Sequence, residues 1–194
     1  MKRIYAFDFD GTLTTRDSLL AFILFACGRR AFVCGMLLHA PLLVLMKLHL
    51  YPNYKAKQRV FAHFFKDMTL QRFNALGSQF AASHRHLLRP AGVDAVNGAL
   101  ATGADVLIVS ASIDNWVQPF FPSVRVVGTK AEVANGRLTG RFLTPNCYGQ
   151  QKVERIRELY PQRSDYHLTA YGDSRGDREL LAWADESHFK PFRK

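Results

Sequence analysis

Near each end of the chain, a short apolar segment runs directly into a pair of aspartates. Segment 3–9 contains Asp8 and is followed by Asp10, and a second such segment is followed by Asp173 and Asp177. Short apolar runs rich in β-branched and aromatic residues predict buried strands. Because the carboxyl ends of parallel strands meet at one edge of a sheet, a fold that pairs these two strands brings carboxylates from opposite ends of the chain together.

The rest of the chain after residue 90 alternates between helical and strand patterns. These patterns predict strands over 105–110, 124–127 and 166–171, and helices over 91–102, 113–121, 150–160 and 178–184. Asn135-Gly136 predicts a hairpin turn between 131–134 and 137–143. Strands that alternate with helices form a parallel sheet covered on both faces, so we expect an α/β fold.

The segment between the first strand and residue 90 has a different character. Helices are predicted over 18–27, 53–66 and 69–87, with Ser18 and Thr69 as N-caps. The chain has 26 Lys and Arg against 16 Asp and Glu, a net charge of +10, and nearly all of the excess lies between residues 18 and 90. We therefore predict a core of residues 1–14 and 91–194 with a basic helical insertion, residues 15–90. Its charge either attracts anions or belongs to a solvated helix surface.

The two acidic clusters have the chemistry of a metal site. Asp8 and Asp10 stand two residues apart in an extended segment, so their side chains share one face. Like charges at this distance require a cation, and hard oxygen ligands suit Mg²⁺. Either cluster alone would be explained by a turn and a helix-capping acid. The occurrence of both, each after a buried strand, favours a metal site that also includes Asp173 and Asp177.

Two further residues fit a phosphate site. Ser110 ends the predicted strand 105–110 and precedes a helix, where hydroxyl and amide groups bind phosphoryl oxygens. Lys152 lies near the start of the helix that opens at Gly149, where a cation does not help the helix dipole. A simple helix cap and an exposed surface lysine are the alternative interpretations.

Four motifs follow one another along the chain: Asp8-Phe-Asp10-Gly-Thr, Ser110, Lys152 and Gly172-Asp173-Ser-Arg-Gly-Asp177. In this order they resemble the motifs of the haloacid dehalogenase superfamily. The position of the helical insertion and the 126–146 segment are similar to the phosphoserine-phosphatase-like branch, the subfamily IB type with a helical C1 cap. The resemblance implies a Rossmann-type parallel-sheet core and a phosphatase. It implies that Asp8 is the nucleophile and that Asp10 is the general acid and then the base.

The resemblance also implies ligands for the other groups. Asp8, the Asp10 carbonyl and Asp173 would hold Mg²⁺, supported by Asp177. Gly11, Ser110 and Lys152 would bind the phosphoryl group. In phosphoserine phosphatases a cap glutamate and a cap arginine read the substrate. Asp17 and Arg59 stand in the corresponding places here, and Arg59 is alternatively one more basic surface residue.

Segment 31–46 is apolar except for His39 and contains Pro41. It is shorter than the roughly 20 residues of a membrane span. One interpretation is a buried cap helix or helix pair. The other is a cap that contacts an anionic membrane, because Arg29, Arg30 and Lys47 flank the segment. A phospholipid head group would then be the substrate, as in the phosphatidylglycerophosphate phosphatases among the relatives of this branch.

The sequence therefore predicts a Mg²⁺-dependent phosphomonoesterase acting on a small phosphorylated substrate, with a membrane-associated lipid-phosphate phosphatase as the alternative. A phosphotransferase is a lesser alternative. A nucleic-acid-binding module would explain the charge, but no RNP, helix-turn-helix or zinc motif supports it, so no nucleic-acid partner is expected. Three scattered cysteines and a charged N-terminus predict a cytoplasmic protein, in the membrane case at the inner face.

Overall fold

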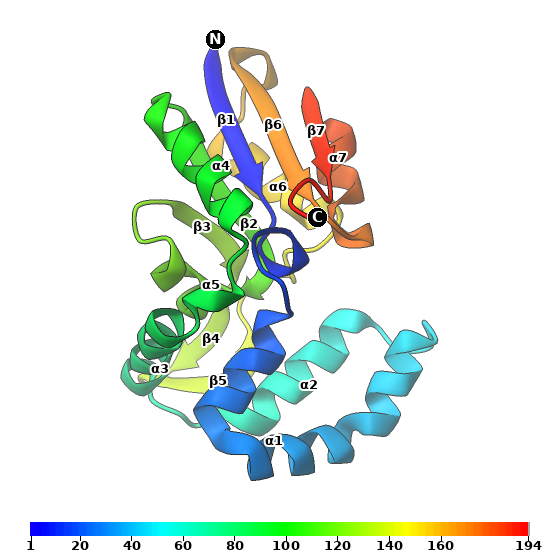
Figure 1. Cartoon of the computed structure of the whole chain (residues 1–194). Coiled ribbons are helices and arrows are strands. Elements are labelled where there is room, and N and C mark those ends of the chain that lie inside the picture. The colour runs from blue at the N-terminus through cyan, green and yellow to red at the C-terminus, as the bar shows by residue number, and fades with distance from the viewer. Residues whose placement is uncertain (194) are drawn as a thin grey trace.

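The computed structural model describes residues 1–193 and contains a parallel five-stranded sheet (Figure 1). The strand order is β3-β2-β1-β6-β7, with bounds β1 (Lys2–Phe7), β2 (Asp105–Ile113), β3 (Arg125–Thr129), β6 (Tyr166–Gly172) and β7 (Glu186–Phe189). The predicted parallel sheet is thus confirmed, with one strand, β7, that the sequence did not predict. Because β1 pairs with both β2 and β6, the two acidic motifs lie on neighbouring strands.

Helices cover both faces of this sheet, as Figure 1 shows. Helix α4 (Pro90–Ala101) lies on one face, and α6 (Gln150–Leu159) and α7 (Arg178–Trp183) lie on the other. The side chains of β1 alternate accordingly. Ile4 packs with Ile156 in one apolar cluster, whereas Phe7 packs with Val96 in the other. Burial on both faces explains why the strands are nearly continuous apolar runs.

A helical layer lies beyond the carboxyl edge of the sheet. It consists of α1 (Ser18–Lys47), α2 (Asn53–Phe65), α3 (Leu70–Ser83) and the short α5 (Asp114–Val117). Phe22 is its centre, with ring centroids 5.0–5.6 Å from Phe65, Phe73, Phe80 and Trp116. Thr69 caps α3 as predicted, accepting a hydrogen bond from Arg72 N at 3.3 Å.

The predicted Asn135-Gly136 turn joins β4 (Ala131–Ala134) to β5 (Arg137–Phe142), and both turn residues have positive φ. The hairpin packs on α2 rather than on the large sheet, with Phe61 and Phe142 ring centroids 5.6 Å apart. Part of the segment predicted as core therefore contacts the inserted helices. The segments that enter and leave the predicted insertion pair with each other through an isolated β-bridge between Thr14 and Leu88. The division at residues 14/15 and 90/91 stays a prediction.

Helix α1 differs from the prediction at its N-cap and in the length of chain that is helical after Gly28. Its N-cap is Asp17, whose carboxylate accepts from Leu20 N, because Ser18 is buried and already helical. The first helical segment ends at Gly28 (φ 78°, ψ 164°), where the sequence predicted an end, and a second helical segment continues from there to Lys47. These dihedrals lie outside the helical region and are accessible to glycine, so Gly28 forms a kink between a proximal and a distal arm of α1.

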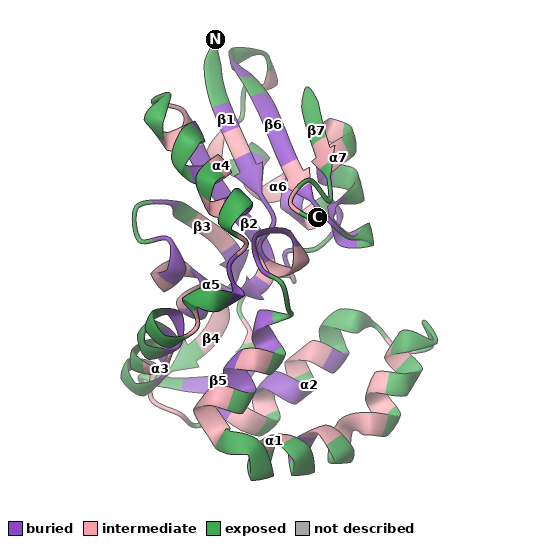
Figure 2. Ribbon diagram, in the orientation of Figure 1, coloured by how far each residue is buried: buried purple, intermediate pink, exposed green. Residues whose placement is uncertain are grey.

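The distal arm of α1, residues 29–47, is not the buried cap helix of the first interpretation. Leu37 and Leu38 are 69% and 65% exposed, and Figure 2 shows this arm mostly in the colours of exposed and intermediate residues. By length and composition α1 passes as a membrane span, and 22% of its most apolar window is buried. Leu19, Phe22 and Ile23 of the proximal arm are packed in the core, so the most exposed apolar side chains of α1 lie in its distal arm.

Candidate active site

Three buried side chains form an ion-pair cluster at the carboxyl edge of the sheet. Asp8 follows β1, Asp177 follows β6, and Lys152 lies in the first turn of α6. Lys152 Nζ lies 2.6 Å from Asp8 Oδ1 and 2.6 Å from Asp177 Oδ1. The structure therefore brings Lys152 to the acidic motifs, as predicted, and places one cation between two carboxylates.

The two ion pairs of Lys152 influence the pKa values of Asp8, Lys152 and Asp177. Burial raises the pKa of Asp8 to about 7, and Lys152 only partly offsets that effect. Burial also acts on Lys152, but Asp8 and Asp177 outweigh it, so the pKa of Lys152 is raised and the ammonium stays charged. Burial acts against ionised Asp177 too, yet Lys152 and hydrogen bonds from Ser174 and Asp173 hold its pKa below the usual range. The cluster thus favours additional positive charge beside Asp8.

Asp173 completes a group of three carboxylates. One oxygen of each of Asp8, Asp173 and Asp177 lies within 4.8 Å of the others. Burial raises the pKa of Asp173, and the guanidinium of Arg193, which pairs with it, lowers the pKa in part. The Arg193 guanidinium therefore already neutralises the Asp173 carboxylate. The hard oxygen donors of the three carboxylates suit a divalent cation.

Gly11 lets the backbone pass close to Asp173. Its φ is +81°, and a Cβ at this position would lie 2.4 Å from Asp173 Oδ2. Only glycine satisfies both the dihedral and the contact. The Gly11 N–H, predicted to bind phosphate, donates to Thr14 Oγ1 at 3.1 Å. Thr12 Oγ1 donates to Asp8 Oδ2 at 2.9 Å, which fixes the carboxylate that faces Lys152.

Asp10 lies on the other side of Asp8 and does not join the three-carboxylate group. Its Oδ1 accepts from Ser18 N at 2.6 Å, and its Oδ2 accepts from the Ser112 hydroxyl at 2.5 Å. Burial raises the pKa of Asp10, with a further contribution from Asp17. A half-buried carboxyl with a raised pKa is suited to give and take a proton.

One cavity of about 1390 Å³ joins these groups. Asp8, Asp10, Ser110, Lys152, Asp173 and Asp177 line it, together with Asp17. On the opposite side it is lined by apolar residues of the distal α1 arm and the following turn: Met36, Leu43, Met46 and Leu50. Arg59 is exposed and does not line the cavity.

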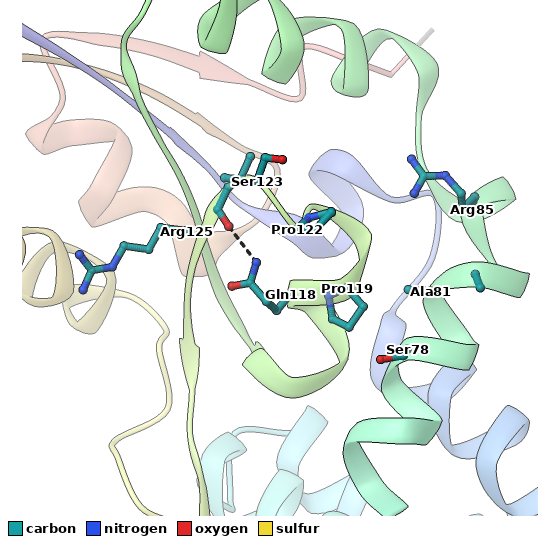
Figure 3. Close-up of a pocket in the computed structure, with 10 residues that line it drawn as sticks. Ser78, Ala81, Arg85, Gln118, Pro119, Pro122, Ser123 and Arg125 are labelled. Carbon is teal, nitrogen blue, oxygen red and sulfur yellow. Dashed lines mark hydrogen bonds between the residues drawn. The ribbon is translucent and has the colours of Figure 1, made fainter. Parts of the chain in front are cut away.

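A second cleft lies between α3 and the turn after α5 (Figure 3). Arg85 and Arg125 are both exposed at its margins. The amide of Gln118 is already used, since its Nε2 donates to Phe121 O and Val124 O. This cleft contains none of the acidic motif residues, so we take the first cavity as the functional site.

The sequence pattern of haloacid dehalogenase-like hydrolases matches residues 5–182, from β1 to α7. The chain belongs to this family. Protein CicA of Caulobacter vibrioides is 37% identical to this hydrolase over 201 residues, which cover 98% of this chain and 86% of that protein.

Solved structures share the fold at lower sequence identity. A protein of unknown function from Bordetella pertussis Tohama I has a TM-score of 0.80 at 22% identity, covering 96% of this chain and 89% of the other. A substrate-bound phosphoserine phosphatase has a TM-score of 0.63 at 16% identity, covering 97% and 86%. These matches confirm the Rossmann-type fold that the motifs implied.

Sequence reasoning missed three residues at the site of this hydrolase. Lys57, not Arg59, reaches the cavity from α2, and its Nζ donates to Ala111 O at 2.8 Å. Helical spacing could have shown this, because Lys57 stands four residues before buried Phe61. Ser112 and Arg193 carry no comparable signal, since each reaches an aspartate that is distant in the sequence.

Proposed function

We propose that this hydrolase cleaves phosphomonoesters in a Mg²⁺-dependent reaction through a phosphoryl group carried on Asp8. The observation that supports this proposal most directly is the buried Asp8 carboxylate, held by Lys152 and Thr12 and facing the same cavity as Asp10. A nucleophile and a proton donor that face one cavity are what phosphoryl transfer to a side chain requires.

The residues fit Mg²⁺ by their donor chemistry. Asp177 already uses one oxygen on Lys152 and the other on Ser174, so we expect Asp8, Asp173 and the Asp10 carbonyl to supply direct ligands, with Asp177 supporting them. The bound ion would neutralise charge on the phosphoryl oxygens and on Asp8. Arg193 would have to leave Asp173 for the ion to bind.

In the first step, an Asp8 oxygen forms a bond to phosphorus and the bond from phosphorus to the ester oxygen breaks. Asp10 in its acid form gives its proton to the departing alkoxide, which is a poor leaving group without it. Lys152, the Ser110 hydroxyl and the Gly11 amide would bind the phosphoryl oxygens, the amide giving up its bond to Thr14.

In the second step, the Asp10 carboxylate takes a proton from a water molecule whose oxygen attacks phosphorus. The bond between phosphorus and Asp8 breaks, which releases inorganic phosphate and restores the free carboxylate. Asp10 is then protonated for the next cycle. We assign residues 15–90 as the cap that, with the β4–β5 hairpin, controls access to these groups.

Phosphate release in the presence of Mg²⁺ tests this proposal. The panel contains phosphoserine, sugar and nucleotide monophosphates, and phosphatidylglycerophosphate in liposomes. We expect release that stops when EDTA removes the metal and resumes when Mg²⁺ is restored. Release that is unaffected by EDTA would contradict the metal assignment, and no release from any of these substrates would contradict the phosphatase assignment.

A second candidate function, a lipid-phosphate phosphatase at the inner face of the membrane, is supported by the distal arm of α1. Its apolar side chains are exposed to solvent, including Val33, Leu37, Leu38 and Val44. No acidic residue occurs between Ser18 and Lys66, whereas Arg29, Arg30 and Lys47 flank the arm. An apolar surface bordered by cations suits an anionic bilayer, and the cavity connects this arm to Asp8.

We expect the protein to co-sediment with vesicles that contain phosphatidylglycerol. Each leucine that enters the bilayer contributes about 1.5–3 kcal/mol, so replacing Leu37 and Leu38 by Asp should weaken binding at least about tenfold. Leu143, which is 63% exposed and lies outside α1, provides the matched control, and Leu143→Asp should bind as wild type does. Equal binding by the double variant and wild type would exclude this arm as the contact surface.

A further inference from the structure

Behind Asp10 lies a row of buried polar groups that the proposed reaction does not itself use. Trp116 Nε1 donates to Ser18 Oγ at 3.0 Å, and Ser18 Oγ lies 3.2 Å from Ser112 Oγ. The Ser112 hydroxyl in turn lies 2.5 Å from Asp10 Oδ2. Ser18, Ser112 and Trp116 are each 0–1% exposed, so water does not compete for these hydrogen bonds.

The two ends of this row fix its direction, because the indole N–H can only donate and the ionised Asp10 carboxylate can only accept. Ser18 Oγ accepts from Trp116, and because the one hydrogen of Ser112 is used on Asp10, the Ser18 hydrogen points toward Ser112 Oγ. The Ser112 hydrogen is then directed to Asp10 Oδ2, the one partner of the row that is a pure acceptor when ionised. The row thus presents a donor, not an acceptor, to Asp10.

The same residues also hold the other oxygen of Asp10. The Ser18 N–H, at the start of α1, donates to Asp10 Oδ1 at 2.6 Å. Ser112 is held in turn from β2, since its N–H donates to Ser110 Oγ at 3.0 Å. Two donors on two oxygens fix the plane of the carboxyl group, so its free lone pairs have a set direction. Asp10 lines the cavity, and a proton on it can therefore be aimed at a substrate.

We propose that Ser112, supported by Ser18 and Trp116, is a positioning residue that holds Asp10 in the orientation needed for proton transfer to the leaving group. This inference rests on the proposed function and deepens it. A general acid acts only within hydrogen-bond reach of the departing oxygen. Without the Ser112 hydroxyl, the Asp10 carboxyl group keeps one of these two hydrogen bonds, from the Ser18 N–H, and can rotate about it.

The test compares two leaving groups in Ser112→Ala. A nitrophenolate leaves without a proton, whereas an alkoxide needs one. We therefore expect kcat/KM for an alkyl phosphate to fall at least about tenfold and kcat/KM for p-nitrophenyl phosphate to fall less than about threefold. Asp10→Asn should show the same selectivity with a larger loss, and Ser112→Thr, which keeps the hydroxyl, should restore most of the alkyl phosphate activity.

The ratio of the two kcat/KM values does not depend on how much of the variant is folded. Thr169, a buried hydroxyl residue on β6, is the matched control, and Thr169→Val should leave the ratio unchanged. Equal losses on both substrates in Ser112→Ala would overturn the positioning role and make Ser112 merely structural. If wild-type protein hydrolyses neither these two substrates nor any substrate of the panel above, the proposed function itself is wrong, which is a different result.

Discussion

Asp8→Asn is expected to abolish turnover, with kcat reduced at least about a thousandfold. The amide has nearly the shape of the carboxylate, but it cannot attack phosphorus. The fold should survive because Lys152 keeps Asp177 as a partner and loses only one of two ion pairs. Steady-state phosphate release and the thermal unfolding temperature, measured on the same sample, check both parts.

A covalent readout makes this prediction sharper. Wild-type protein quenched during turnover should carry a phosphoryl label that hydroxylamine removes, as it does from acyl phosphates. Asp8→Asn should carry none. Asp165→Asn, at an exposed carboxylate at the opposite end of β6 from the acidic motif, should behave as wild type does. A hydroxylamine-sensitive label in Asp8→Asn would place the nucleophile on another residue.

Lys152→Met is expected to destabilise the fold as well as to remove activity. The substitution leaves Asp8 and Asp177 buried without their shared cation, and breaking a buried ion pair from one side costs about 3 kcal/mol or more. For a chain of this size that corresponds to a Tm lower by roughly 6–12 °C. Differential scanning calorimetry in EDTA measures this loss directly.

Mg²⁺ should restore part of the stability of Lys152→Met, because a divalent cation at Asp8 and Asp173 replaces some of the lost positive charge. The matched control is Arg157→Met on the same helix, where the Arg157–Glu154 pair is solvent-exposed at 3.8 Å, so the Tm should change by less than about 2 °C. A Tm for Lys152→Met within 2 °C of wild type would show that the buried pair does not support the fold.

The sequence was informative where a residue's role follows from its own neighbours. Asp8, Asp10, Asp173 and Asp177 each follow a strand with a strong apolar pattern, and topology brings those strand ends together. The Asn135-Gly136 turn was predictable for the same reason, since its dihedrals are local. Strand β7 was missed because it is an edge strand with mostly exposed side chains, so it lacks the apolar signal of a buried strand.

Contacts between distant segments explain the other differences. Ser18 looked like a cap, but burial against Ser112 and Trp116 makes it the first helical residue, with Asp17 as the cap. The distal α1 arm has the composition of a buried helix, and no pattern within residues 31–46 indicates that side chains such as Leu37 and Leu38 remain exposed. The break at Gly28, by contrast, was predictable, because its dihedrals are local and are accessible to glycine.

The central place of β1 has a consequence for synthesis on the ribosome. Strand β1 pairs with β6, which follows it by roughly 160 residues, about 10–30 s of elongation at ordinary speeds. During that time the nascent chain exposes an apolar strand with one open edge. Lys152 and Asp173 emerge long after Asp8, so a prematurely terminated product has Asp8 without these partners. Quality control of unfinished chains therefore meets an aggregation-prone species in which the acidic site is incomplete.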